Sequence, residues 1–224
     1  MTRRSRAPAP PPPTRPETHA RLASHAPRTW QRMLSGRRLN LLDPSPMDIE
    51  IGDIALGLAR NTRWNGQTSG AHAWSVAQHS VLVVDLVRRL IAPRRDTELE
   101  LAALLHDASE YVTHDLITPL KAVVGDVFKE VEDRLMVAVH VRFGLPSRLD
   151  VERKALIKRA DLIAGATEAV QLAGFQPGEV RGLLGIKEKP WPDLTLTPLP
   201  SRDAERLYLE TFEAIGARLA LERR

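Results

Sequence analysis

The 224-residue sequence contains no cysteine. This absence excludes a disulfide framework and every thiolate chemistry, and it fits a protein of the reducing cytoplasm. The sequence also lacks any uninterrupted run of about 18 apolar residues, so we expect no membrane-spanning helix. We find no internal repeat and no convincing alternation of apolar and polar residues of the kind that predicts a β-strand.

The net charge of +4 is unevenly distributed along the chain. Residues 1–28 hold six Arg and one acidic residue, Glu17, so this segment carries +5 and the remainder carries −1. Because the body of the protein is not basic, we expect no specific nucleic-acid partner. The segment is rich in Pro, Ala and Arg without a hydrophobic period, which predicts a disordered or polyproline-like tail rather than a targeting peptide. Residues 29–224 are expected to form a single domain.

From about Trp30 onward, apolar residues recur on helical spacing. Ser75 with Gln78, and Thr97 with Glu100, follow the capping-box pattern of a helix start. The predicted helices lie within residues 48–64 and then over residues 75–91, 96–112, 126–144, about 150–172 and about 201–221. The Pro-bearing stretch 176–200 is expected to be irregular, either a surface excursion or a lid. The predicted fold class is therefore all-α, a compact helical bundle with short links.

Ionisable residues interrupt three of these apolar helices. In the stretch LLHDASEYVTHDLITPLK, residues 104–121, His106 and Asp107 directly follow an apolar run, and Glu110 comes three residues later. On a helix these three side chains share one face. His79 lies near the start of another apolar helix, and Asp161 lies within a third. Burying such groups without partners costs several kcal/mol, so something in the fold must compensate them.

Two interpretations of these residues remain open from spacing alone. Two imidazoles and two carboxylates on three helices can converge on one divalent cation, and mixed N/O ligands suit Mn, Fe, Co, Ni or Zn. Alternatively, each His is a satisfied core or surface side chain, and Asp161 caps a neighbour or pairs with the nearby Arg159. His-Asp dipeptides are common, so the motif by itself does not decide between these interpretations.

The order His79, His106-Asp107, Asp161, with Glu110 completing an HDxxE motif, resembles the HD-domain metal-dependent phosphohydrolase superfamily. Within it, residues 104–121 are most similar to the small bacterial 5′-deoxynucleotidases. The resemblance covers roughly residues 50–170. It implies one divalent transition metal held by His79, His106, Asp107 and Asp161. It also implies that Glu110 orients or deprotonates the attacking water, with Asp107 beside it in the catalytic centre.

The same resemblance implies a substrate pocket. Arg63 would hold the phosphate, and Trp64 would press on the sugar and exclude a 2′-hydroxyl. Asp115 and Thr118 would line the sugar pocket, with Pro119 restricting Thr118 to extended geometry. The Arg63-Trp64 pair lies one residue further from His79 than the family spacing, so the base and sugar pocket is expected to differ in detail.

The expected function is thus removal of the 5′-phosphate from 2′-deoxyribonucleotides by a metal-dependent phosphohydrolase. A small HD-type deoxynucleoside triphosphate hydrolase and a non-catalytic nucleotide sensor on the same fold are the alternatives. The resemblance favours a homodimer. Glu168 shares the helical face of Asp161 and is expected at the surface or behind the ligands, and Lys121 is expected to be a solvated charge.

Overall fold

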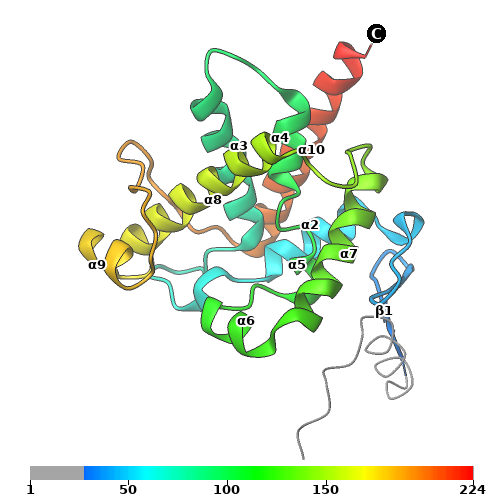
Figure 1. Ribbon diagram of the computed structural model, residues 1–224, viewed down its shortest axis with the longest axis horizontal. Coiled ribbons are helices and arrows are strands. Elements are labelled where there is room, and N and C mark those ends of the chain that lie inside the picture. Colours follow the sequence, from blue (N-terminus) through cyan, green and yellow to red (C-terminus); the bar gives the residue numbers. More distant parts are fainter. Residues whose placement is uncertain (1–27, 224) are drawn as a thin grey trace, which may run out of the picture.

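The computed structural model describes residues 28–223, and nearly all of the regular structure in this range is helical (Figure 1). This confirms the predicted all-α class. Of the predicted tail, all but Arg28 lies outside the described residues. The elements are β1 (Trp30–Arg32), β2 (Arg38–Asn40), η1 (Pro46–Asp48), α2 (Ile51–Arg60), η2 (Arg63–Gly66), α3 (Val76–Ile91), α4 (Thr97–Leu104), α5 (Glu110–Thr113), α6 (Thr118–Val124), α7 (Asp126–Arg142), α8 (Val151–Gln171), α9 (Pro177–Gly182) and α10 (Ser201–Glu222).

A small hairpin precedes the bundle, although no strand is expected from the sequence. β1 and β2 pair antiparallel, with Trp30 opposite Asn40 and Arg32 opposite Arg38. Gly36 in the connecting turn has φ +97°, a conformation that favours glycine. Each strand has only three residues, which is too short for an alternating pattern to be recognised in the sequence.

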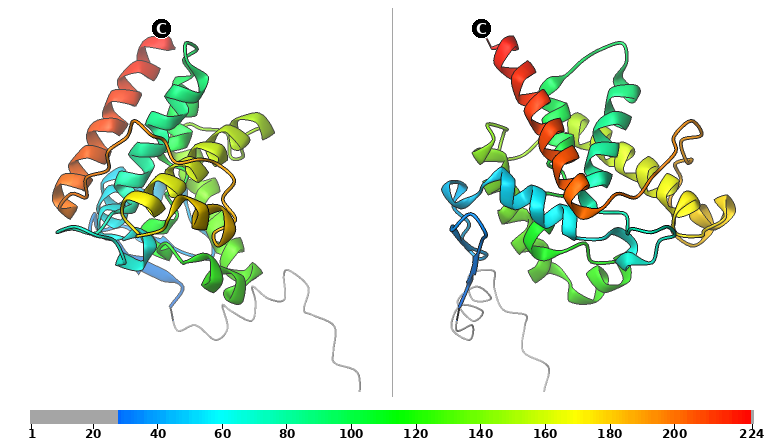
Figure 2. Two further views of the ribbon diagram at one scale, coloured as in Figure 1. Left: turned by 90° about the vertical axis from the view of Figure 1, so that its left-hand side faces the viewer. Right: turned by 180° about the vertical axis from the view of Figure 1, so that it is seen from behind.

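Helix α3 is the centre of the bundle and packs against α2, α4, α8 and α10. In the view from behind, α10 runs diagonally across the back of the molecule, while α8 lies on the other side of α3 (Figure 2). The large apolar side chains of these helices form one main core. His79 lies in the first turn of α3 and is completely buried. Among the described residues, no helix combines the length and apolarity needed to cross a bilayer.

The helix starts follow from local side-chain caps. The Ser75 hydroxyl accepts a hydrogen bond from the Gln78 backbone N–H at 3.2 Å, which confirms the predicted start of α3. The predicted start at Thr97 is wrong by one residue, because Asp96 accepts from the Leu99 N–H at 2.9 Å and is the actual cap of α4. A carboxylate is as good a cap as a hydroxyl and also complements the helix dipole.

The stretch 176–200 contains one short helix, α9, and is otherwise irregular. Its backbone is fastened along α3 and α8 by the side-chain amides of two glutamines. Gln78 donates to Thr197 O at 2.9 Å, and Gln171 donates to Leu194 O at 2.6 Å. The backbone N–H of Leu196 donates in turn to Gln171 Oε1 at 2.9 Å. These bonds attach the stretch to the surface of α3 and α8.

A close approach of α2 to α5 makes Gly57 a sensitive position. A Cβ added at Gly57 would lie 2.7 Å from both Cβ and the carbonyl O of Tyr111, whereas one added at Gly52, in the same helix, would meet nothing within 4 Å. We therefore expect Gly57→Ala to lower the free energy of unfolding by about 1–3 kcal/mol through overpacking. Gly52→Ala should be neutral or stabilising by up to about 1 kcal/mol, because Ala favours helix. Urea denaturation of both variants checks the pair, and equal stabilities would contradict the predicted clash.

Candidate metal centre

The helix predicted over residues 96–112 is broken where His106 and Asp107 occur. α4 ends at Leu104 and α5 begins at Glu110, so these two residues lie in a turn rather than on a helical face. The His106 side chain contributes to the break, because its Nδ1 atom hydrogen-bonds to the carbonyl O of Ala103 at 2.8 Å. From α10, the buried Tyr208 hydroxyl donates to the carbonyl O of Leu104 at 3.2 Å. The start of the turn is thus fixed by two hydrogen bonds, one from the His106 side chain within the turn and one from Tyr208 in α10.

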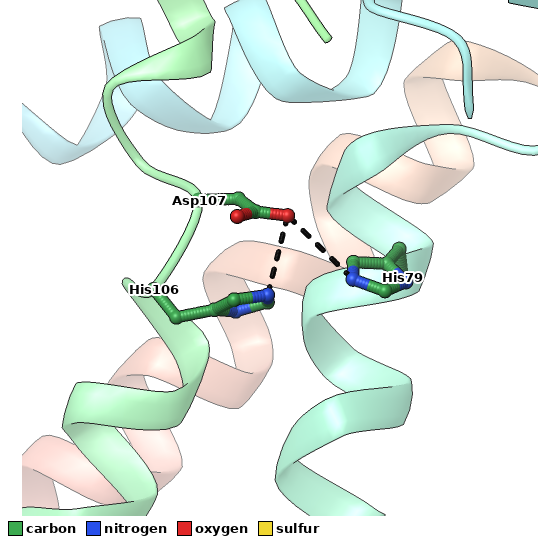
Figure 3. Close-up of side chains that lie close together, drawn as sticks. All are labelled: His79, His106 and Asp107. Atoms are coloured by element: carbon green, nitrogen blue, oxygen red, sulfur yellow. Dashed lines mark ion pairs between the residues drawn. The ribbon is translucent and has the colours of Figure 1, made fainter. Parts of the chain in front are cut away.

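The turn brings Asp107 and His106 against His79 at the start of α3 (Figure 3). Asp107 Oδ2 lies 3.5 Å from His79 Nε2 and 3.2 Å from His106 Nε2, and the two imidazole rings are 5.3 Å apart between centroids. One ligand atom from each of the three residues lies within 4.8 Å of the others, which is close enough to hold one metal ion. Ligands about 2.1 Å from a shared ion lie about 3.0–3.4 Å apart at octahedral or tetrahedral angles.

Hydrogen bonding leaves the correct nitrogen of each imidazole available. A backbone carbonyl can only accept, so His106 Nδ1 carries a proton toward Ala103 O. His79 Nδ1 lies 2.6 Å from Glu168 Oε1 and donates to it in the same way. The Nε2 atoms of both residues are buried and form no hydrogen bond within the described part of the chain. Their nearest polar neighbours are the carboxylate oxygens of Asp107 and Asp161. When Nε2 is deprotonated, each imidazole presents a lone pair beside these oxygens, as a metal site requires, so the residues fit a metal.

Asp161, the fourth predicted ligand, lies beside this group. Its Oδ1 is 3.3 Å from His79 Nε2, while its Oδ2 pairs with Lys158 Nζ at 2.6 Å. Asp161 does not belong to the group whose ligand atoms all lie within 4.8 Å of one another. From α8, Asp161 therefore directs Oδ1 toward the centre, while its Oδ2 forms an ion pair with Lys158.

The electrostatics of the centre favour a cation. Burial opposes ionisation of Asp107, but the imidazoles of His106 and His79 hold the pKa of its carboxyl well below its usual range. The same two imidazoles outweigh burial at Asp161 and lower the pKa of that carboxyl too. Burial lowers the pKa of the His79 imidazole, but the carboxylates of Glu168 and Asp161 outweigh it and raise that pKa to about 10. Ionised carboxylates thus converge on the histidines.

Glu110 begins α5 one turn beyond Asp107, and its N–H donates to the Asp107 carbonyl at 3.0 Å. Its Oε1 pairs with Lys121 Nζ at 3.3 Å, while its Oε2 is buried without a hydrogen bond in the described structure. Burial, together with the negative charges of Asp107 and Asp115, raises the pKa of Glu110 to about 8. The expectation that Lys121 is a solvated charge is therefore wrong, because Lys121 pairs with Glu110 at the site.

Arg63 and Trp64 lie next to the same centre, in η2. The Arg63 guanidinium pairs with Asp115 through Nη1 at 3.1 Å and with Glu168 through Nε at 3.3 Å. The Trp64 indole N–H donates to Glu168 Oε2 at 3.0 Å. Trp64 and Asn65 both adopt positive φ values, 57° and 51°, which non-glycine residues adopt at a cost. Three predicted site residues, Arg63, Trp64 and Asp115, are thus joined in one network.

Thr118 differs from its prediction. It is exposed and forms the first residue of α6, with Pro119 directly after it, so it does not have the extended geometry expected from the following proline. Proline is well tolerated in the first turn of a helix, where its missing N–H has no partner to lose. The residue in extended geometry is instead Ile117, with ψ 145°.

Of the two positions expected for Glu168, at the surface or behind the ligands, the structure shows the second. It is not at the surface but completely buried, and it lies behind His79, Arg63 and Trp64. Burial raises the pKa of its carboxyl, but His79 and Arg63 outweigh this and lower it to about 2. Its position seven residues after Asp161, within the small-residue stretch IAGATEAV, is the signal that indicates an inward-facing carboxylate.

Two curated proteins are similar to this chain over three quarters of its length. The uncharacterized protein RCAP_rcc00048 of Rhodobacter capsulatus is 56% identical over 167 residues, which cover 75% of this chain and 83% of that protein. The chain belongs to its family. The uncharacterized protein YfdR of Escherichia coli is 34% identical over 170 residues, covering 75% of this chain and 85% of YfdR, and belongs to the same family. Neither name states an activity, and no family model matches the sequence.

Proposed function

We propose that this protein is a metal-dependent phosphohydrolase of the HD-domain type that removes the 5′-phosphate from 2′-deoxyribonucleotides. The observation that carries the proposal is the convergence of the buried Nε2 atoms of His79 and His106 on one oxygen of Asp107, with an oxygen of Asp161 also beside His79. An ordinary core would not leave two imidazole nitrogens and a carboxylate in this arrangement. The resemblance of residues 50–170 to HD-domain 5′-deoxynucleotidases supplies the reaction class.

His79, His106, Asp107 and Asp161 would hold the ion, for which Mn, Co, Fe, Ni and Zn are the candidates. When bound, such an ion lowers the pKa of a coordinated water and neutralises phosphoryl oxygens. The protein supplies the geometry, because Glu168 and Ala103 O fix the tautomers of the two histidines.

Glu110 is the proposed base. Its Oε1 is held by Lys121, so the buried Oε2 is the atom that accepts a proton from the attacking water. A carboxyl with a pKa close to neutrality is suited to accept this proton and to return it to the leaving sugar oxygen.

Arg63 is the proposed phosphate ligand. A guanidinium has five N–H donors, of which Arg63 uses one for Asp115 and one for Glu168 within residues 28–223, so three are available there for phosphoryl oxygens. Trp64, held in a costly backbone conformation beside it, is the proposed sugar contact. Asp115 and Thr118 as sugar-pocket residues, a homodimer and a cytoplasmic location stay predictions.

A substrate screen tests this function. We expect the protein with Mn²⁺ or Co²⁺ to release inorganic phosphate from 2′-deoxynucleoside 5′-monophosphates and to act much more slowly on the ribonucleotides. His106→Ala, purified in parallel, should be inactive and controls for contaminating phosphatases. Release of triphosphate or pyrophosphate from deoxynucleoside triphosphates would replace the proposed reaction. Binding of nucleotides without any turnover would indicate a sensor instead.

A further inference from the structure

Glu168 is a completely buried carboxylate that accepts hydrogen bonds from two separate parts of the candidate site. Its Oε1 binds His79 Nδ1 at 2.6 Å, in the first turn of α3. Its Oε2 binds Trp64 Nε1 at 3.0 Å and Arg63 Nε at 3.3 Å, in η2. One oxygen therefore faces the metal ligands, and the other faces the segment proposed to contact the nucleotide.

The choice of a carboxylate at this position has a chemical reason. All three partners are N–H donors, and an ionised carboxylate is the side chain that accepts from every direction without donating. A glutamine of the same size has one acceptor oxygen and one NH₂ group, so it can satisfy only one of the two sides. Its NH₂ group would face an N–H donor on the other side and leave that donor buried without a partner.

The backbone of η2 indicates that this anchoring is needed. Trp64 and Asn65 hold positive φ values in succession, a conformation that persists only when surrounding contacts enforce it. Two contacts of Trp64 do so, the hydrogen bond from its indole to Glu168 and the packing of its ring against Phe175 at 5.8 Å between centroids. A substitution of Glu168 would therefore affect both the orientation of His79 and the conformation of the Arg63-Trp64 segment.

We infer that Glu168 is a positioning residue that couples the metal ligand His79 to the Arg63-Trp64 segment. The affinity of the site for metal and the conformation of this nucleotide-binding segment would then depend on each other. This inference rests on the proposed metal site. The coupling is reciprocal by thermodynamic necessity: whatever metal binding does to the segment, occupation of the segment does to metal binding.

The first experiment measures the Mn²⁺ dissociation constant of Glu168→Gln by electron paramagnetic resonance, without nucleotide. We expect a 10- to 100-fold loss of affinity, the usual order for removing the partner of a ligating histidine. Glu100→Gln is the matched control, because Glu100 is also buried and accepts from arginines, Arg88 at 2.8 Å and Arg218, whereas in the described part of the chain it forms no ion pair with a residue of the candidate site. Its Mn²⁺ affinity should equal that of the wild type. Equal losses in both variants, or none in Glu168→Gln, would overturn the inference.

The second experiment follows the Trp64 indole N–H resonance by ¹H–¹⁵N NMR during titration with diamagnetic Zn²⁺, with Trp64→Phe identifying the signal. In the wild type the resonance should shift as Zn²⁺ binds, because its acceptor is the carboxylate that also binds His79. In Glu168→Gln, at saturating Zn²⁺, the shift should be lost. A wild-type resonance that does not respond to Zn²⁺ would show that the two sides are not coupled. Neither experiment requires turnover, so an absence of nucleotidase activity would count against the proposed function alone.

Discussion

Replacing Glu110 with Gln should lower kcat by about 10²- to 10⁴-fold while leaving Mn²⁺ affinity unchanged. The substitution keeps the size of the side chain and the backbone bond from the Glu110 N–H to Asp107 O, but it removes the proton acceptor at Oε2. Because Glu110 Oε1 pairs with Lys121 and Glu110 is not one of the proposed ligands, metal binding should survive. Steady-state kinetics and Mn²⁺ titration of the same sample separate these two effects.

Glu132→Gln provides the control for this prediction. Glu132 is the second carboxylate that pairs with Lys121, at 3.7 Å, so its loss changes the environment of the lysine without removing the proposed base. Its kcat should stay close to that of the wild type. Wild-type turnover in Glu110→Gln would remove Glu110 from the mechanism.

Removing the metal should abolish turnover and also destabilise the fold. A ligand that binds only the folded state at 100 times its dissociation constant adds about 2.7 kcal/mol to the free energy of unfolding. For a chain of this size, that corresponds to a Tm decrease of about 5–11 °C after chelation. The effect arises because the ligands His79, His106 and Asp107 come together only in the folded chain, so the ion stabilises the folded state and not the unfolded one. Calorimetry before and after EDTA, and after return of Mn²⁺, measures it.

Two variants serve as controls that separate the predicted Tm decrease on metal removal from indirect effects of the chelator. His106→Ala and Asp107→Asn each remove one ligand, so their Tm should not respond to Mn²⁺ at the concentration that stabilises the wild type. A wild-type Tm that is the same with and without Mn²⁺, in protein first stripped of metal, would mean that the histidines hold no ion.

The helical framework was predictable because local signals decide where its elements begin. Ser75 caps α3 as its sequence pattern indicates, and α8 begins after Asp150, whose side chain accepts from the Arg153 N–H at 2.8 Å. The hairpin was not predictable, since three-residue strands contain too few positions to establish a period. The end of α4 at Leu104 was also not predictable, because the apolar spacing of the sequence continues past it. The hydrogen bond from the His106 side chain to Ala103 O, which competes with the backbone bonds of a helix, has no signature in that spacing.

The candidate site was predictable where an ionisable residue interrupts an apolar pattern, as His79 and Asp107 do. The resemblance to a known family added Arg63 and Asp115, which the structure joins by an ion pair. The role of Glu168 could not be predicted in the same way. Its partners lie 89 to 105 positions away in the chain, and no local pattern encodes such distances.

The hydrogen bond from Tyr208 to the carbonyl of Leu104 links the His106-Asp107 turn to a helix that is synthesised about a hundred residues later. A nascent chain that has reached α8 already contains every proposed ligand but still lacks this support. During translation, this hydrogen bond can form only after α10 has left the ribosome and docked on α2, α3 and α4. The last support of the turn is thus added after all of the proposed ligands have been synthesised.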